Sequence, residues 1–239
     1  MSIRAASPAS SPSIPLYLQI SESLSRDIAA GRFADGDRLP PERELARRFS
    51  TTVRTLRKAL NELQNQELLE SVQGSGNYIR LTEQNRSIYS MFRLELPQGG
   101  GLPTAVVLDV TRLNKPTSFP LFGTSKSATR IRRLRCLDQT AIAIEEIWLD
   151  SHAGEIDAAK LGDSLYRYYQ MNLGFWITRA EDSVSVRPLP EWTPDSLGSE
   201  AGTTFGFVER LSWAQKARPV EYSRTWFDPA KSRYVQRLK

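Results

Sequence analysis

The chain of 239 residues contains only one cysteine and one histidine, and this scarcity excludes several classes of protein. A single cysteine, Cys136, cannot form an internal disulfide, and it suits the reducing cytosol. Because no histidine is near it in the sequence, Cys136 is interpreted as part of the core rather than as a nucleophile. The lone His152 lies in a polar loop and argues against a histidine-rich metal site. We therefore expect no metal ion and no other cofactor.

Long hydrophobic runs are also lacking. No apolar stretch reaches the length that spans a membrane, and the N-terminus lacks the apolar segment of a signal peptide. We therefore expect a cytoplasmic protein without a membrane partner. The composition, with 40% hydrophobic and 25% charged residues, is that of a folded chain of one or two domains. The formal net charge of +5 mildly favours an anionic partner.

The first half of the chain contains two short helical patterns with many basic residues. The second pattern places four apolar residues on one face at helical spacing, namely Val53, Leu56, Leu60 and Leu63. Between positions 43 and 58 a single acid, Glu44, accompanies six bases, which are Arg43, Arg47, Arg48, Arg54, Arg57 and Lys58. A short helix with one apolar and one cationic face fits the DNA major groove, whose edges are lined by phosphates. The alternative is a solvated basic face on an ordinary helical hairpin.

The segment after these helices predicts a β-hairpin. Residues 68–72 and 77–80 have strand patterns, and Gln73-Gly74-Ser75-Gly76 forms the turn between them. A further helix is predicted over residues 16–30, and the small polar residues 1–13 predict a disordered arm. Three helices followed by a hairpin form the winged helix-turn-helix plan. Glycine at the wing tip allows the backbone to approach a phosphate or the minor groove closely.

Residues 14–80 resemble the DNA-binding domain of GntR-family bacterial transcription regulators. Five motifs in order carry the resemblance, namely Leu16-Tyr17-x-Gln19-Ile20, Asp37-x-Leu39-Pro40, Glu42-Arg43-Glu44-Leu45-Ala46, Thr55-Leu56-Arg57-x-Ala59-Leu60 and Gly74-x-Gly76. The sequence departs from the family at Val53, which stands where an arginine usually follows the hydroxyl residue, here Thr52. Arg54 comes next, but neighbouring helix positions point about 100° apart, so its direction differs from that of the missing arginine.

The resemblance and the cationic face together predict a DNA-binding surface formed by the second and third helices and the wing. Its residues are Arg43, Thr52, Arg54, Thr55, Arg57, Lys58, Gln73, Gly74 and Ser75.

The second half of the chain has the composition of a β-rich domain, predicted over residues 104–239. It follows a predicted linker region, residues 81–103, with a flexible point at Gly99-Gly100-Gly101. Strands are predicted over residues 106–113, 129–137, 141–149, 177–189, 205–214 and 220–227, and helices over residues 163–172 and 194–200. Such an order predicts a mainly antiparallel sheet, so we expect an α+β protein.

About residues 104–237 resemble the effector-binding domain called UTRA, which occurs in the HutC type of GntR regulator and has a fold like chorismate lyase. The matching motifs are Arg133-Leu134-Arg135, Ala141-x-Ala143-Ile144-Glu145, Ser164-Leu165-Tyr166 and Pro219-Val220-Glu221-Tyr222. The other GntR subgroups fit less well. One carries an all-helical domain, often with a histidine metal site, and another carries a large pyridoxal-phosphate enzyme-like domain.

Six residues in these motifs are predicted to bind the effector, namely Arg133, Arg135, Glu145, Ser164, Tyr166 and Glu221. Two arginines at alternate positions of a strand point to one face, where they attract phosphate or carboxylate. The glutamates accept hydrogen bonds from ligand hydroxyl or amino groups, and a serine near a helix start adds a hydroxyl. The alternative is an internal salt bridge between one of the arginines and Glu145 or Glu146.

The resemblance implies a homodimeric repressor that binds a roughly palindromic double-stranded DNA operator and is released from it by a small anionic metabolite. A dimer presents two third helices to half-sites about one helical turn apart. The competing hypothesis is a chorismate-lyase-like enzyme domain fused to a DNA-binding domain, because the same fold hosts catalysis elsewhere. The sequence shows no nucleophile elbow, metal-ligand spacing or clear phosphate loop, so we expect no enzyme activity.

Overall fold

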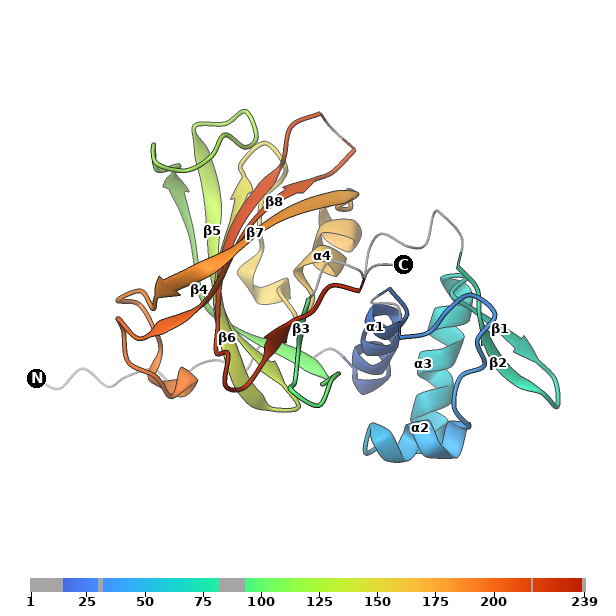
Figure 1. Ribbon diagram of the computed structural model, residues 1–239. Helices are drawn as coiled ribbons and strands as arrows, with labels where there is room; N and C mark the ends of the chain where they lie inside the picture. The colour runs from blue at the N-terminus through green and yellow to red at the C-terminus, as the bar shows by residue number, and fades with distance from the viewer. Residues whose placement is uncertain (1–14, 30–31, 82–92, 216, 238–239) are drawn as a thin grey trace, which may run out of the picture.

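The structure, a computed structural model, describes residues 15–29, 32–81, 93–215 and 217–237, and it consists of two parts that lie side by side (Figure 1). Among these residues, the first part holds three helices and a two-stranded hairpin, and the second is built on a six-stranded sheet. The predicted α+β class and the order of the two parts are confirmed. The predicted arm, residues 1–13, lies outside the described residues.

The first part is a winged helix-turn-helix unit with helices α1 (Leu16–Ala29), α2 (Glu42–Arg48) and α3 (Val53–Asn65). Each helix turns apolar side chains inward at helical spacing. The core that they share includes Ile20, Leu24, Ile28, Leu45, Ala46, Leu56, Ala59, Leu60 and Leu63. Thr52 caps α3, because its hydroxyl accepts a hydrogen bond from the Thr55 backbone N–H at 3.2 Å.

The wing is an antiparallel pair of strands, β1 (Leu69–Val72) and β2 (Gly76–Ile79), in the predicted place. Gly74 at its tip has a φ of 75°, a left-handed conformation that favours glycine. Arg38, in the segment before α2, forms an isolated β-bridge with Tyr78. The wing is therefore joined to the rest of the winged unit along its second strand.

The second part is an antiparallel sheet with the strand order β4-β5-β6-β9-β8-β7. The strands are β4 (Pro103–Asn114), β5 (Ser127–Leu137), β6 (Thr140–Asp150), β7 (Arg179–Pro188), β8 (Thr204–Trp213) and β9 (Glu221–Phe227). They coincide with the six segments predicted from β-branched and aromatic residues. The register of β4 against β5 shifts between Val107 and Asp109, which marks a bulge at one edge of the sheet.

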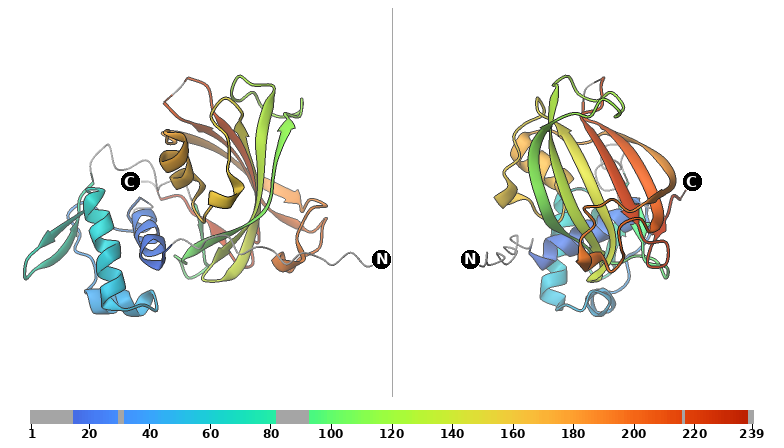
Figure 2. Two further views of the ribbon diagram at one scale, coloured as in Figure 1. Left: turned by 180° about the vertical axis from the view of Figure 1, so that it is seen from behind. Right: turned by 90° about the vertical axis from the view of Figure 1, so that its left-hand side faces the viewer.

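Short helical segments cover the sheet on the side that faces the winged part (Figures 1 and 2). They are η1 (Ala158–Lys160), α4 (Leu165–Tyr168) and the π-helical turn η2 (Tyr169–Leu173). The helix predicted over residues 163–172 is therefore present but changes pitch at Tyr169, and Gly174 ends it in a left-handed conformation. The helix predicted over residues 194–200 is only a short 3-10 turn, η3 (Asp195–Leu197).

Residues 93–102, predicted to belong to the linker, are held by contacts with both parts. The strand β3 (Leu94–Glu95) pairs with β10 (Arg233–Tyr234). The glycines 99–101 all have positive φ, and Gly99 and Gly100 close a turn by backbone hydrogen bonds with Leu96. This turn lies against the winged part, since a Cβ added to Gly99 would be 2.8 Å from Arg32 Nη2. Residues 82–92 of the predicted linker lie outside the described residues.

Gly206 supplies a test of the packing within the sheet. It lies on β8 opposite Phe227 of β9, and an added Cβ would be 2.2 Å from the Phe227 ring. We expect Gly206→Ala to lower the free energy of unfolding by about 1–3 kcal/mol, because the buried ring has to leave its position to admit the methyl group. Urea denaturation measures the change. Thr204→Ala, at an exposed position of the same strand, is the control and should stay within about 0.5 kcal/mol of the parent. Equal stability of Gly206→Ala and the parent would contradict this packing.

Candidate functional site

The outer face of α3 carries the cationic side chains predicted from the sequence. Leu56 and Leu60 are buried against the winged core, whereas Arg54, Arg57 and Lys58 are exposed. The helix therefore separates an apolar side from a cationic side, as its spacing predicted.

Two arginines of α2 and α3 form ion pairs, and a third is exposed. Arg57 Nε donates to Glu42 Oε2 at 2.8 Å, but the Arg57 side chain is 67% exposed, so this is a weak surface ion pair. Arg48 pairs with Asp27 at 2.7 Å, which ties α2 to α1. Arg43 is exposed on α2. The arginines thus divide into one that fastens helices together and others that face solvent.

The start of α3 shows where Val53, which stands in place of the family's usual arginine, is packed. The Thr52 and Thr55 hydroxyls are 3.0 Å apart and close the first turn. Val53 is half-buried and packs against the winged core. The exposed cation at the beginning of the helix is therefore Arg54, one position further along.

The wing ends in small polar residues. Gln73 and Gly74 are exposed at the tip, and the Ser75 hydroxyl lies 2.6 Å from the Tyr78 hydroxyl. Figure 1 shows that the wing projects from the side of the winged part remote from the six-stranded sheet, whereas α1 faces the sheet. The predicted DNA contacts therefore come from α2, α3 and the wing, and α1 is left to meet the second part.

A cavity lies between the sheet and the helical segments of the second part and extends to α1. All six residues predicted to bind an effector line it, namely Arg133, Arg135, Glu145, Ser164, Tyr166 and Glu221. Its volume of about 140 Å³ leaves room for on the order of ten water-sized groups. The fold therefore brings together residues that are far apart in the sequence, at a site that suits a small molecule.

Arg133 and Arg135 of β5 line this cavity together, as their alternation predicted. Arg133 lies opposite Glu145 of β6, and its Nη2 is 2.5 Å from Glu145 Oε1. Arg135 Nε is 3.7 Å from the same oxygen, and Arg135 Nη1 donates to the Asp163 carbonyl at 2.9 Å. Burial lowers the pKa of Arg135, and the Glu145 charge opposes this shift. The salt bridge considered as an alternative is therefore present, and it lies inside the cavity.

The next charges along β5 and β6 form a separate cluster around Glu146. Arg132 Nε donates to Glu146 Oε2 at 2.8 Å, and Arg224 and Trp148 donate to the other oxygen. Burial alone would raise the pKa of Glu146, but these hydrogen bonds lower it. Neither Arg132 nor Glu146 lines the cavity. Arg132 and Arg133 are neighbours on β5, but Arg132 pairs with Glu146 outside the cavity and Arg133 pairs with Glu145 inside it.

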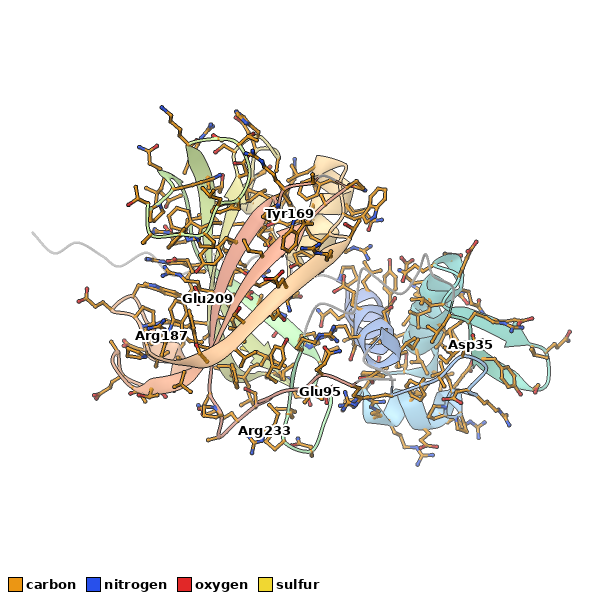
Figure 3. All side chains as sticks on the ribbon, turned by 45° about the horizontal axis from the view of Figure 1, so that its top comes forward. Asp35, Glu95, Tyr169, Arg187, Glu209 and Arg233 are labelled. Atoms are coloured by element: carbon orange, nitrogen blue, oxygen red, sulfur yellow. The ribbon has the colours of Figure 1, made fainter. Side chains whose placement is uncertain are left out.

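Glu221 is 1% exposed and accepts hydrogen bonds from three protein hydroxyls. Tyr169 donates at 2.6 Å, Ser212 at 2.9 Å and Tyr166 at 3.2 Å. Figure 3 shows Tyr169 between the helical segment and the sheet. Burial raises the pKa of Glu221 although these hydrogen bonds oppose the shift. Because protein hydroxyls already occupy its oxygens, the arrangement favours a role for Glu221 in orienting Tyr166.

Ser164 has a structural task as well as a place in the cavity wall. It is the N-cap of α4, and its hydroxyl accepts a hydrogen bond from the Arg167 backbone N–H at 3.3 Å. The predicted position at a helix start is therefore correct.

Sequence reasoning missed Arg210, which also lines the cavity. Its Nε and Nη2 donate to the two oxygens of Asp182, both at 2.6 Å, and Tyr234 donates to the same carboxylate at 2.6 Å. Burial alone would lower the pKa of Arg210, but the hydrogen bonds with Asp182 outweigh it and raise the pKa. Asp182 and Arg210 lie opposite each other on β7 and β8. To predict this pair from the sequence, the register of β7 against β8 would have had to be predicted correctly.

Sequence reasoning also missed the contribution of α1, whose Glu22 and Arg26 line the cavity. Arg167 of the second part lies 3.8 Å from Glu22, measured between Nη1 and Oε1. The helical spacing of the apolar residues of α1 identifies the face that packs on the winged core. It does not indicate that the second part of the molecule covers another face of this helix.

The structure describes no group of three or more His, Cys, Asp or Glu residues placed to hold a metal ion in residues 15–29, 32–81, 93–215 and 217–237. Over the same ranges, no helix is long and apolar enough to cross a membrane. Cys136 is buried, and His152 Nδ1 lies 3.0 Å from the Thr124 hydroxyl.

Two protein-family models match the chain. The one described as bacterial regulatory proteins, gntR family, matches residues 16–79, and the UTRA domain matches residues 100–233. The chain is 51% identical to the HTH-type transcriptional regulator SmoD of Agrobacterium fabrum over 228 residues, which cover 95% of this chain and 97% of SmoD. It is 27% identical to the mannosyl-D-glycerate transport/metabolism system repressor MngR of Escherichia coli, over 90% of this chain and 92% of MngR.

Solved structures show the same fold. The transcriptional regulator YydK of Bacillus subtilis matches with a TM-score of 0.52 at 20% identity, over 95% of this chain and 100% of that chain. The ligand-binding domain of a GntR-family regulator from Bordetella bronchiseptica matches with a TM-score of 0.54 at 20% identity, over 62% of this chain and 98% of that chain.

Proposed function

Because the chain belongs to the GntR family of bacterial regulatory proteins and carries a UTRA domain, we propose that it is a homodimeric repressor released from its operator by a small anionic metabolite. That it is a DNA-binding transcription regulator follows from the family. The proposal concerns repression, the dimer and the chemistry of the effector. The observation that carries it is the concentration of arginine side chains around one cavity.

The charge of the cavity favours an anion. Six arginines and four carboxylates line it, and Asp182 behind the wall pairs with Arg210, which leaves a surplus of one positive charge. A buried surplus of charge is unfavourable unless a counter-ion enters. Arg133 and Arg135 share one carboxylate, Glu145, and Arg133 Nε has no hydrogen-bond partner among the described residues. An anionic group beside these two arginines would supply a second negative charge and a hydrogen-bond acceptor for Arg133 Nε.

The proposed roles follow from position. The anionic group of the effector is held by Arg133, Arg135 and Ser164, and its hydroxyl or amino groups are bound by Glu145 and Tyr166, with Glu221 acting through Tyr166. The related repressor MngR is named for a mannosyl-D-glycerate system, and glycerate is a carboxylate. An organic acid or phosphorylated sugar of similar size is the class of effector that we propose here.

The proposed DNA contacts are Arg43, Thr52, Arg54, Thr55, Arg57, Lys58, Gln73, Gly74 and Ser75. The exposed cationic face of α3 and the exposed wing tip support this assignment. Cations on this face attract the phosphates, and the residues at the start of α3 are placed to reach base edges. Two such faces in a dimer suit a roughly palindromic operator.

We place the dimer contact on β7, one of the two edge strands of the sheet. Val184 and Val186 are 53% and 67% exposed on this strand, and exposed apolar residues on an edge strand favour pairing with another chain. If two copies of β7 pair in antiparallel fashion about Val184, Glu181 of each copy lies opposite Arg187 of the other. Figure 3 shows Arg187 at the end of β7 remote from the winged part. The other edge, β4, has a bulge that disturbs such pairing.

The DNA-binding assignment predicts a loss of affinity in Arg43→Ala and Arg57→Ala. Loss of a base contact should weaken binding by about 1–3 kcal/mol and relax specificity. Loss of a phosphate contact should instead lower the slope of the logarithm of the binding constant against the logarithm of the salt concentration by about one. Gel-shift titrations on a duplex selected by the parent from random sequence measure both effects. Glu42→Ala, which removes only the partner of Arg57, is the control and should not weaken binding. Parent-like binding by both arginine variants would refute the assignment.

The effector assignment predicts a ligand that stabilises the parent but not Arg135→Ala. At a hundred times its dissociation constant, a true effector should stabilise the fold by about 2.7 kcal/mol. A thermal-shift screen of organic acids, phosphorylated sugars and amino-acid breakdown products identifies it. Arg132→Ala is the matched control, because this neighbouring arginine of β5 contacts Glu146 outside the cavity. An undiminished response in the Arg133→Ala/Arg135→Ala double variant would move the site elsewhere.

The β7 assignment predicts that a charge reversal disrupts the dimer and a charge swap restores it. Glu181→Arg or Arg187→Glu alone sets like charges opposite each other twice, whereas the two changes together recreate opposite-charge pairs. Sedimentation velocity at micromolar concentration should show a dimer for the parent and the double variant, and weakened association for the single variants. Val106→Lys on β4 is the control and should remain dimeric. A monomeric parent, or single variants that associate like the parent, would exclude this contact.

A further inference from the structure

The helix α1 has two neighbours, the winged core and the second part of the molecule (Figures 1 and 2). Its apolar residues Ile20, Leu24 and Ile28 pack in the winged core. Its polar residues are nevertheless buried as well, and Glu22 is only 7% exposed. A carboxylate is rarely buried to this extent unless a charged partner meets it. For Glu22 the charged neighbours are Arg26 on the same helix and Arg167 of the effector domain.

Glu22 extends the DNA-binding domain into the effector cavity. Its Oε1 lies 3.8 Å from Arg167 Nη1, and the cavity that it lines is also lined by Arg133 and Arg135. Arg26, one turn further along α1, lines the same cavity, and its Nε donates to the Glu22 carbonyl at 3.2 Å. Burial raises the pKa of Glu22, and the charges of Arg26 and Arg167 oppose the shift. An acidic group of one domain is thus placed among the arginines of the other.

Outside the cavity, a second charged contact joins the two parts. Glu95 of β3 binds Arg32 of the winged part, and Arg237 donates to the same carboxylate at 2.6 and 3.1 Å. Figure 3 shows Glu95 at the junction between the two parts. This pair is shielded from solvent about as well as the contact at Glu22, since the Glu95 side chain is 12% exposed and the Glu22 side chain 9%. The junction therefore has two charged contacts, and of these two only the one at Glu22 lines the cavity.

We propose that Glu22 is an internal competitor of the effector. Its carboxylate lies at Arg167 in the same cavity as the anion site proposed at Arg133, Arg135 and Ser164, and it competes for the same positive charge. Effector binding therefore expels Glu22 and separates α1 from the effector domain. The inference rests on the anion site proposed above and adds the link from that site to the DNA-binding domain.

Competition of this kind supplies what a regulatory ligand needs. A ligand shifts a conformational equilibrium only by the difference in its affinity for the two arrangements. With Glu22 in place the cavity already contains an anion, and with Glu22 withdrawn the same arginines attract another. The effector therefore binds the separated arrangement more tightly, and no relay through distant residues is required.

The first test uses inorganic phosphate as the anion probe, titrated calorimetrically into the full chain. Glu22→Gln keeps the shape of the side chain but removes its charge, so we expect it to bind phosphate roughly five- to tenfold more tightly than the parent. Glu44→Gln changes an exposed carboxylate of α2 and is the control for net charge, with parent-like binding expected. Equal or weaker phosphate binding by Glu22→Gln would overturn the proposal.

The second test measures the separation of the two parts directly. Spin labels at Ser71→Cys in the wing and at the exposed Leu121→Cys, in a Cys136→Ala background, report the distance between them. The parent should gain a new distance population when phosphate is added, and Glu22→Gln should show it without phosphate. If Glu22→Gln keeps the distances of the phosphate-free parent, the proposal fails. Failure of the anion site itself is recognised separately, because phosphate binding would then persist in Arg133→Ala/Arg135→Ala.

Discussion

An arginine removed from water requires an anion or a carbonyl to receive its hydrogen bonds, and the region around the cavity is arranged by this requirement. Arg133 of β5 and Glu145 of β6 are opposite each other in the strand register and form an ion pair, so the pairing of these strands also pairs their charges. The Asp163 carbonyl receives Arg135 and thereby fixes the chain just before α4. Asp182 does the same for Arg210 and joins β7 to β8. Charge pairing thus positions the elements that apolar packing alone would leave free to slide.

Most of the fold was predictable because its determinants are local. The three helices follow from apolar residues at helical spacing, and Thr52 and Gly74 mark a helix start and a turn by their own chemistry. The strands follow from β-branched and aromatic segments. The alternation along β5 was enough to place Arg133 and Arg135 in the same cavity, although the motif resemblance was needed to add Tyr166 and Glu221.

The rest depended on contacts between distant segments. The spacing of α1 describes its own core but not the domain that covers Glu22, and nothing near Arg210 in the sequence points to Asp182. Composition pointed only to flexibility at the glycines 99–101, whereas in the structure all three adopt a positive φ, a conformation that favours glycine. The change of pitch at Tyr169 likewise serves a distant partner, because this residue donates its hydroxyl to Glu221 on β9.

The unequal edges of the sheet bear on how many copies of the chain can assemble. The register of β7 against β8 is regular over its whole length, whereas β4 is interrupted by its bulge. A sheet with two regular edges can add copies at both and grow into a fibre. A sheet with one regular edge can pair only once, through a two-fold contact between the two regular edges. The edges that remain free in such a pair are both bulged and do not accept a further copy. The bulge in β4 would therefore act as a stop that limits growth to a closed pair and protects an edge-pairing protein from polymerisation.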